Sequence, residues 1–176
     1  MNIRNQYQIG NIVKNRKILS YAIIGLSLIF IFAYLFDGIK EICFPFKGLG
    51  FPYKSPTFYV LKLFYAYLFL LGGYDLLRER SRSWYLMMFS SIGMLISYGI
   101  YYFNGYIFRT TGLDLFFLEI SSFFIIILFN ISCFVKRFEI SVPNKRWLLL
   151  GIFIIINFAI NDILMWLLHR YCWICW

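Results

Sequence analysis

Five long hydrophobic stretches, separated by short polar or charged links, occupy most of this 176-residue chain. Each stretch approaches the roughly 20 residues that a helix needs to cross a hydrocarbon core about 30 Å thick. None alternates as a membrane β-strand does, and each is about twice as long as such a strand. We therefore predict one all-α, polytopic integral membrane domain over residues 1–176. Its five transmembrane helices are expected at residues 18–36, 57–74, 84–103, 115–135 and 147–168.

The lysines and arginines are divided unevenly between the two sides of this predicted bundle. Of the 17, 11 precede the first stretch or lie in the second and fourth links, whereas five lie on the opposite side and Lys62 lies within a stretch. Short links rich in Lys and Arg remain on the cytoplasmic side of a membrane. The distribution predicts an amino terminus inside and a carboxyl terminus outside.

The net charge of +9 bears on the choice of partner. A basic protein can bind nucleic acid, but these charges are dispersed beside the predicted helices rather than gathered in one patch. We therefore expect no nucleic-acid partner. The expected partner of the basic residues is the lipid bilayer, whose anionic headgroups balance their charge. The expected location is the cytoplasmic membrane of a bacterium or the inner membrane of an organelle.

Three ionisable residues lie inside the predicted helices at a similar depth. Lys62, Glu119 and Asp162 each fall about 6 to 9 Å below the outer end of their stretch. A charge in hydrocarbon costs about 2.5 to 3.5 kcal/mol, so such groups face the bundle interior and pair. We expect Lys62 to contact at least one of the two carboxylates, and His169 shares a helix face with Asp162. The layer is either structural, as an ion pair or a lysine that extends to the outer interface, or a site for an ion, a proton or a substrate head group.

Two further sets of residues favour close helix packing. Gly93 and Ser97 form a small-xxx-small pair in the third stretch, and small residues let membrane helices approach closely. Such a pair serves packing within one chain or a contact between subunits. Asn157 and Asn161 stack at i and i+4 in the fifth stretch, where amides either hydrogen-bond neighbouring helices or line a pore. We favour packing over a pore for these amides.

The cysteines raise the question of redox or metal chemistry. Cys172 and Cys175 have the C-x-x-C spacing of many redox pairs, on the predicted outer side. Together with His169 they could instead supply three metal ligands. The motif stands alone at an aromatic terminus and is not specific to either chemistry. Cys133, near the end of the fourth stretch, is expected to be a small buried apolar residue.

Sequence motifs of the common enzyme classes are missing, so we assign no catalytic residue and no cofactor, and a role other than catalysis is favoured. The first hypothesis is a non-catalytic membrane subunit that assembles as a homo-oligomer or within a larger membrane complex. The second is a small ion or solute channel or carrier that uses Lys62, Glu119 and Asp162. The third is a membrane thiol-redox or metal-site protein built on Cys172 and Cys175.

Overall fold

The computed structural model of the protein describes residues 3–43, 56–103 and 113–172. Helices and the short segments that connect them account for all of these residues, and no strand occurs among them. The helices are α1 (Ile3–Cys43), α2 (Pro56–Leu77), α3 (Ser83–Phe103), α4 (Leu113–Leu128), α5 (Ser132–Arg137) and α6 (Arg146–Cys172).

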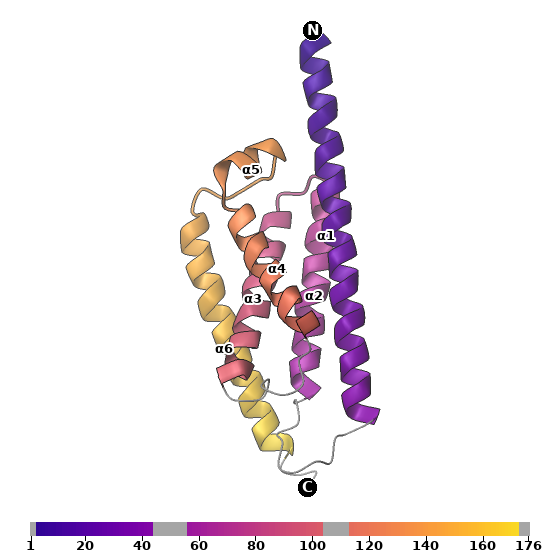
Figure 1. The fold of residues 1–176 in the computed structure, drawn as a ribbon. Helices are drawn as coiled ribbons and strands as arrows, with labels where there is room; N and C mark the ends of the chain where they lie inside the picture. Colours follow the sequence, from indigo (N-terminus) through magenta and orange to yellow (C-terminus); the bar gives the residue numbers. More distant parts are fainter. Residues whose placement is uncertain (1–2, 44–55, 104–112, 173–176) are drawn as a thin grey trace.

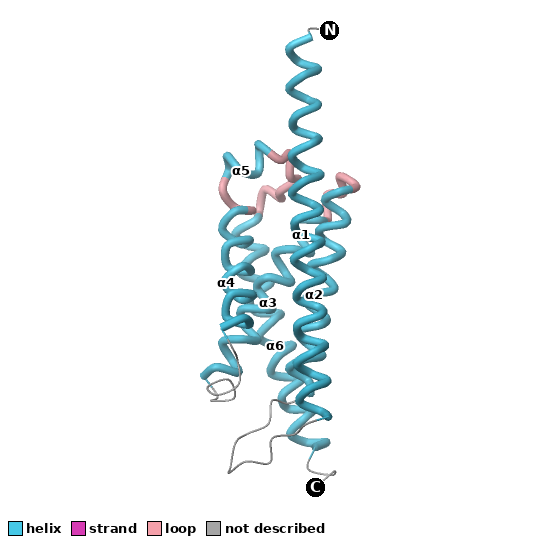
Figure 2. Tube along the Cα trace, turned by 45° about the vertical axis from the view of Figure 1, so that its right-hand side comes forward, coloured by secondary structure: helices cyan, strands magenta, loops and turns pink. Residues whose placement is uncertain are grey.

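The long helices run side by side in alternating directions, and the short α5 lies across one end of the bundle (Figure 1). α3 is the central helix because it packs against α2, α4 and α6, whereas α1 packs mainly against α2. Figure 2 shows the same arrangement from a second direction, with the two ends of the chain at opposite ends of the bundle. The fold therefore has a core around α2 and α3 and two peripheral helices, α1 and α6.

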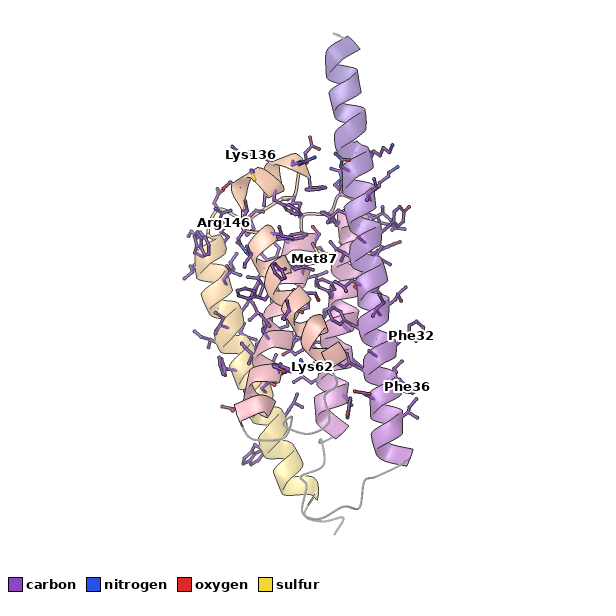
Figure 3. All side chains as sticks on the ribbon, viewed as in Figure 1. Phe32, Phe36, Lys62, Met87, Lys136 and Arg146 are labelled. Carbon is purple, nitrogen blue, oxygen red and sulfur yellow. The ribbon has the colours of Figure 1, made fainter. Side chains whose placement is uncertain are left out.

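Among the described residues, four helices are long and apolar enough to cross a membrane, which supports the predicted transmembrane class. These segments are Val13–Ile39, Tyr59–Leu77, Ser83–Ile100 and Arg146–Leu164. Figure 3 shows Lys136 and Arg146 at the end of the bundle that carries α5, and Lys62 closer to the opposite end. In the same view Phe32 and Phe36 of α1 point away from the bundle, as expected for side chains that face lipid.

The first helix is much longer than its hydrophobic stretch. α1 has 41 residues, which corresponds to about 60 Å, twice the thickness of a hydrocarbon core. Its first turns extend beyond the rest of the bundle (Figure 1). No proline interrupts residues 3–43, and once a helix is nucleated each further residue joins it at little cost. Hydropathy therefore located the apolar part of α1 but not the ends of the helix.

The fourth stretch is not one continuous helix, in contrast to the prediction over residues 115–135. α4 ends at Leu128, and a turn precedes α5. Asn130 donates a side-chain hydrogen bond to the Ile126 carbonyl at 2.7 Å, and the Trp84 indole donates to the Phe129 carbonyl at 3.2 Å. These bonds satisfy carbonyl groups that the ending helix leaves free. The expectation that Cys133 is buried is wrong, because α5 buries none of its residues and this thiol is exposed.

Two adjacent glycines allow α2 to pack closely on both sides. A Cβ atom on Gly72 would lie 2.6 Å from Cγ of Met87 in α3, and one on Gly73 would lie 2.9 Å from Cγ2 of Ile23 in α1. Distances this short leave no room for a side chain. The pair Gly72–Gly73 therefore brings α1 and α3 close to α2.

Candidate functional site

The most unusual residue in the bundle is Lys62, whose side chain is completely buried between α1, α2 and α3. Its Nζ atom donates a hydrogen bond to the backbone carbonyl of Met94 at 2.8 Å. The same atom lies 5.8 Å from the ring centroid of Tyr34 and 5.7 Å from that of Tyr98. The helices α1 and α3 thus contribute one carbonyl and two aromatic faces to the ammonium group that α2 carries.

These contacts suit a charged lysine. The negative face of an aromatic ring attracts a cation, and the attraction reaches about 2 kcal/mol when water is excluded. The Met94 carbonyl adds a charge-assisted hydrogen bond, which is stronger than one between neutral groups. Ser122 of α4 donates to Sδ of Met94 at 3.3 Å, so the fourth helix also packs at this level. The prediction that Lys62 faces the bundle interior agrees with its placement.

The other members of the predicted layer do not all join Lys62. Asp162 is exposed on α6, and within the part of the chain that the structure describes no ion pair joins it to Lys62. The side chains of Glu119 in α4 and His169 in α6 lie outside the described residues. A contact between Lys62 and Glu119 therefore stays a prediction.

A second polar group lies at the crossing of α2, α3 and α6, where Tyr65 follows Lys62 by about one helical turn of α2. Gly93 of α3 is buried there, and a Cβ atom on it would collide with the Tyr65 ring and lie 2.6 Å from Oδ1 of Asn157. Ser97, also buried, donates its hydroxyl hydrogen to the Gly93 carbonyl at 2.7 Å. This packing lies inside one chain, so the face of Gly93 and Ser97 is not available to another subunit.

The two asparagines are buried at the same crossing. Asn157 donates to the carbonyls of Phe153 at 2.8 Å and of Phe89 in α3 at 3.4 Å, and Asn161 donates to the Asn157 carbonyl at 2.8 Å. Both amides hold their amino groups against backbone, and Asn157 links α6 to α3. This is the packing role that the sequence favours for them.

Three oxygen atoms at this crossing have no hydrogen-bond partner among the described residues. They are Oη of Tyr65, Oδ1 of Asn157 and Oδ1 of Asn161. Leaving a buried polar atom unsatisfied costs about 1 to 3 kcal/mol. We define the interior polar cluster as Lys62, Tyr65, Gly93, Asn157 and Asn161. Chemically it offers one cation and three oxygens that can accept hydrogen bonds inside an apolar bundle.

A charge cluster that sequence reasoning missed lies at the α5 end of the bundle. Arg16 of α1 is buried and pairs with Glu79 in the α2–α3 turn and, at 3.4 Å, with Glu139 after α5. Both glutamates adopt positive φ angles, 60° and 51°, which are unusual for residues with a side chain. Arg16 thereby ties together three segments that are far apart in the sequence. From the sequence, the position of Arg16 before a hydrophobic stretch indicated only that it contributes to the orientation of the chain in the membrane.

Asp75 forms a second pair of contacts at the same end. Its carboxylate is buried, and it accepts hydrogen bonds from Arg82 and, at 3.4 Å, from Arg80. The hydrogen bond to this carboxylate raises the pKa of Arg82 above its ordinary value. The spacing of Asp75 to Arg80 and Arg82 could have predicted this contact from the sequence, because a tight turn after α2 places those arginines beside the end of that helix.

The thiol-redox and metal hypothesis is not tested by this geometry. Cys172 is the last residue of α6, where its side chain lies outside the described residues, and Cys175 lies beyond them entirely. Comparisons of the chain with protein-family models, with curated proteins and with solved structures found no match.

Proposed function

We propose that this protein is a non-catalytic integral membrane subunit, which works within an oligomer or a larger membrane complex. One observation carries the proposal: α6 is attached to the rest of the chain along a single narrow face. Only 17% of its apolar span is buried, compared with 56% for α3. The buried side is marked by Leu150, Asn157 and Asn161, and the opposite side exposes large apolar residues together with Asp162.

The exposed side of α6 supports assembly because of its polarity as well as its size. Lipid can cover apolar side chains, so their exposure alone does not require a protein partner. A carboxylate within the span is different, because its contact with lipid costs about 2.5 to 3.5 kcal/mol. An assembly that covers this side of α6 removes that cost.

We further propose five membrane spans, with the amino terminus inside, in a bacterial cytoplasmic membrane or an organelle inner membrane. α4 would be the fifth span; its 16 residues correspond to about 24 Å, and it runs obliquely across α3 within the bundle (Figure 1). The basic residues of the α5 end, Lys136 and Arg137 among them, favour the inner side for that end.

The topology is tested in intact cells by labelling single cysteines introduced into a variant in which the native Cys43, Cys133, Cys172 and Cys175 are replaced by alanine. A membrane-impermeant reagent should modify a cysteine beside Lys47 but not one beside Arg80 or Lys145. The reverse pattern, or equal modification at all three places, would overturn the orientation.

Assembly is tested by measuring the size of the protein in mild detergent, before and after cross-linking. We expect a species larger than one chain with its detergent. A single chain without any co-purifying partner, and with full activity in its membrane, would contradict the proposal. Gly93→Leu is not a suitable probe of association, because Gly93 packs against Tyr65 and Asn157 inside the chain.

A small ion or solute carrier is the second candidate, and the interior polar cluster favours it. A buried ammonium on α2 and three acceptor oxygens on α2 and α6 could hold a polar solute as it crosses the bundle. Reconstituted vesicles would show whether the protein carries flux of small anions or protons. Lys62→Met should then abolish the flux, whereas Lys17→Met, at an exposed position, should not. Equal flux in both variants would exclude this role for Lys62.

A further inference from the structure

The exposed residues on the outward side of α6 are regularly spaced. Exposed residues recur there every three or four positions, so they form one line along the helix, opposite Asn157 and Asn161. We name this line the α6 outer seam. Its residues are Leu148, Gly151, Ile155, Ala159, Asp162 and Trp166.

Asp162 lies within the apolar length of the seam. It is 16 residues after Arg146 and ten before Cys172, which places it about 24 Å and 15 Å from the two ends of α6. A lysine at this depth can extend its long side chain toward the interface, but aspartate has a single methylene group. Within the described residues no ion pair satisfies this carboxylate. Among the described residues Asp162 is therefore an exposed carboxylate that forms no ion pair, on a helix apolar enough to cross a membrane.

The seam also has room for the backbone of another helix. A Cβ atom on Gly151 would meet nothing within 4 Å. Ala159, eight residues later, is exposed on the same line. Small residues at such spacing let a second helix approach closely, and close approach shortens the distance between polar partners on the two helices.

Charge indicates which partner fits. Two copies joined symmetrically through the seam would bring Asp162 against Asp162, and like charges in a medium of low dielectric repel strongly. Among the described side chains, the exposed lysines and arginines lie in the first half of α1, around the α2–α3 turn, in α5 and in the segment before α6, and not near Asp162 in the second half of α6. Lys62 of a second copy is buried in its own bundle. A second copy therefore offers no described base at the depth of Asp162.

We propose that the α6 outer seam docks a transmembrane helix of a different membrane protein, which carries a lysine or arginine opposite Asp162. The proposal rests on the proposed function as a membrane subunit and makes it more specific, because it favours a hetero-complex over a homo-oligomer. The partner's cation meets the carboxylate, and its apolar residues pack over Gly151 and Ala159. This is the arrangement by which intramembrane charges are usually satisfied.

The experiment uses the full chain in lipid vesicles and synthetic helices as probes. One probe is a helix of about 20 leucines with a single lysine at the depth of Asp162, and a second carries leucine only. Energy transfer between labels on the chain and on the probe reports binding. We expect the chain to prefer the lysine probe by about 5- to 30-fold, since intramembrane polar contacts contribute about 1 to 2 kcal/mol.

Variants separate the seam from other surfaces. Asp162→Asn should remove most of the preference, and Asp162→Lys should transfer it to a probe that carries aspartate. Ile163→Asn, at an exposed position off the seam, should leave the preference unchanged. Gly151→Leu should weaken binding of every probe, whereas Gly25→Leu in α1, where a Cβ atom also meets nothing, should not.

The result that overturns the proposal is equal binding of the lysine and leucine probes, or a preference that persists in Asp162→Lys. The outcome differs from failure of the proposed function. If detergent sizing shows a complex that Asp162→Asn leaves intact, the protein is a subunit but the seam is not its docking surface. If sizing shows a lone chain that still selects the lysine probe, the seam stands and the proposed function fails.

Discussion

Replacement of Gly93 by alanine gives the sharpest test of how the bundle is held together. The added methyl group would collide with the Tyr65 ring and lie 2.6 Å from Oδ1 of Asn157. The ring cannot easily move away, because Tyr65 is fully buried and packs against the rings of Phe64 and Phe89, with centroids 5.6 and 6.2 Å apart. We therefore expect Gly93→Ala to force α3 away from α2 and α6.

The magnitude follows from two opposing effects. Forcing an extra methyl group into a well-packed interior costs about 1 to 3 kcal/mol. Alanine in place of glycine favours a helix by about 0.5 to 1 kcal/mol, which offsets part of that cost. The difference between these ranges gives a net loss in free energy of unfolding of about 0 to 2.5 kcal/mol. Gly99→Ala is the matched control in the same helix, because a Cβ atom there meets nothing within 4 Å.

The assay is reversible unfolding in mixed micelles as the fraction of denaturing detergent rises, followed by far-ultraviolet circular dichroism. Gly99→Ala should be as stable as the parent or more stable by up to about 1 kcal/mol. Tyr65→Leu combined with Gly93→Ala should recover part of the loss, since the smaller side chain makes room for the methyl group. Equal stability of Gly93→Ala and Gly99→Ala would refute the packing argument. If the Gly93→Ala chain kept its stability but lost its partners, Gly93 would belong to a subunit interface.

Two further predictions concern charged residues. Arg16→Ala should lower the free energy of unfolding by only about 1 kcal/mol in the same assay, because both partner glutamates are more than half exposed. The control Lys17→Ala, at an exposed position, should change it by less than about 0.5 kcal/mol. An effect of equal size in both variants would contradict the stabilising role of the Arg16 ion pairs. Lys62→Met should destabilise the bundle more than Lys62→Met combined with Glu119→Gln, since the second change removes a carboxylate that would otherwise lose its cation. Strictly additive effects in this cycle would show that Lys62 and Glu119 are not partners.

Hydropathy located most helices well because it depends only on nearby residues. The stretches predicted at 57–74, 84–103 and 147–168 agree with α2, α3 and α6 to within four residues at each end. The membrane class follows from the same local pattern, since a long apolar helix suits a bilayer wherever it lies in the fold. The prediction was less accurate at the ends of α1 and within the fourth stretch. There the backbone depends on helix propagation and on side-chain hydrogen bonds such as that of Asn130.

Asn161 and Asp162 show what the sequence by itself determined and what only the tertiary structure decided. Both are polar and adjacent, and composition marked each of them as unusual within a membrane helix. About 100° of helical rotation separates them, so one is buried against the bundle while the other is exposed. Which of the two faces inward depends on how α6 packs on α3, and the same is true of Lys62 and of Arg16 with its glutamates. Such placements result from contacts between residues far apart in the chain, and local hydropathy carries no information about them.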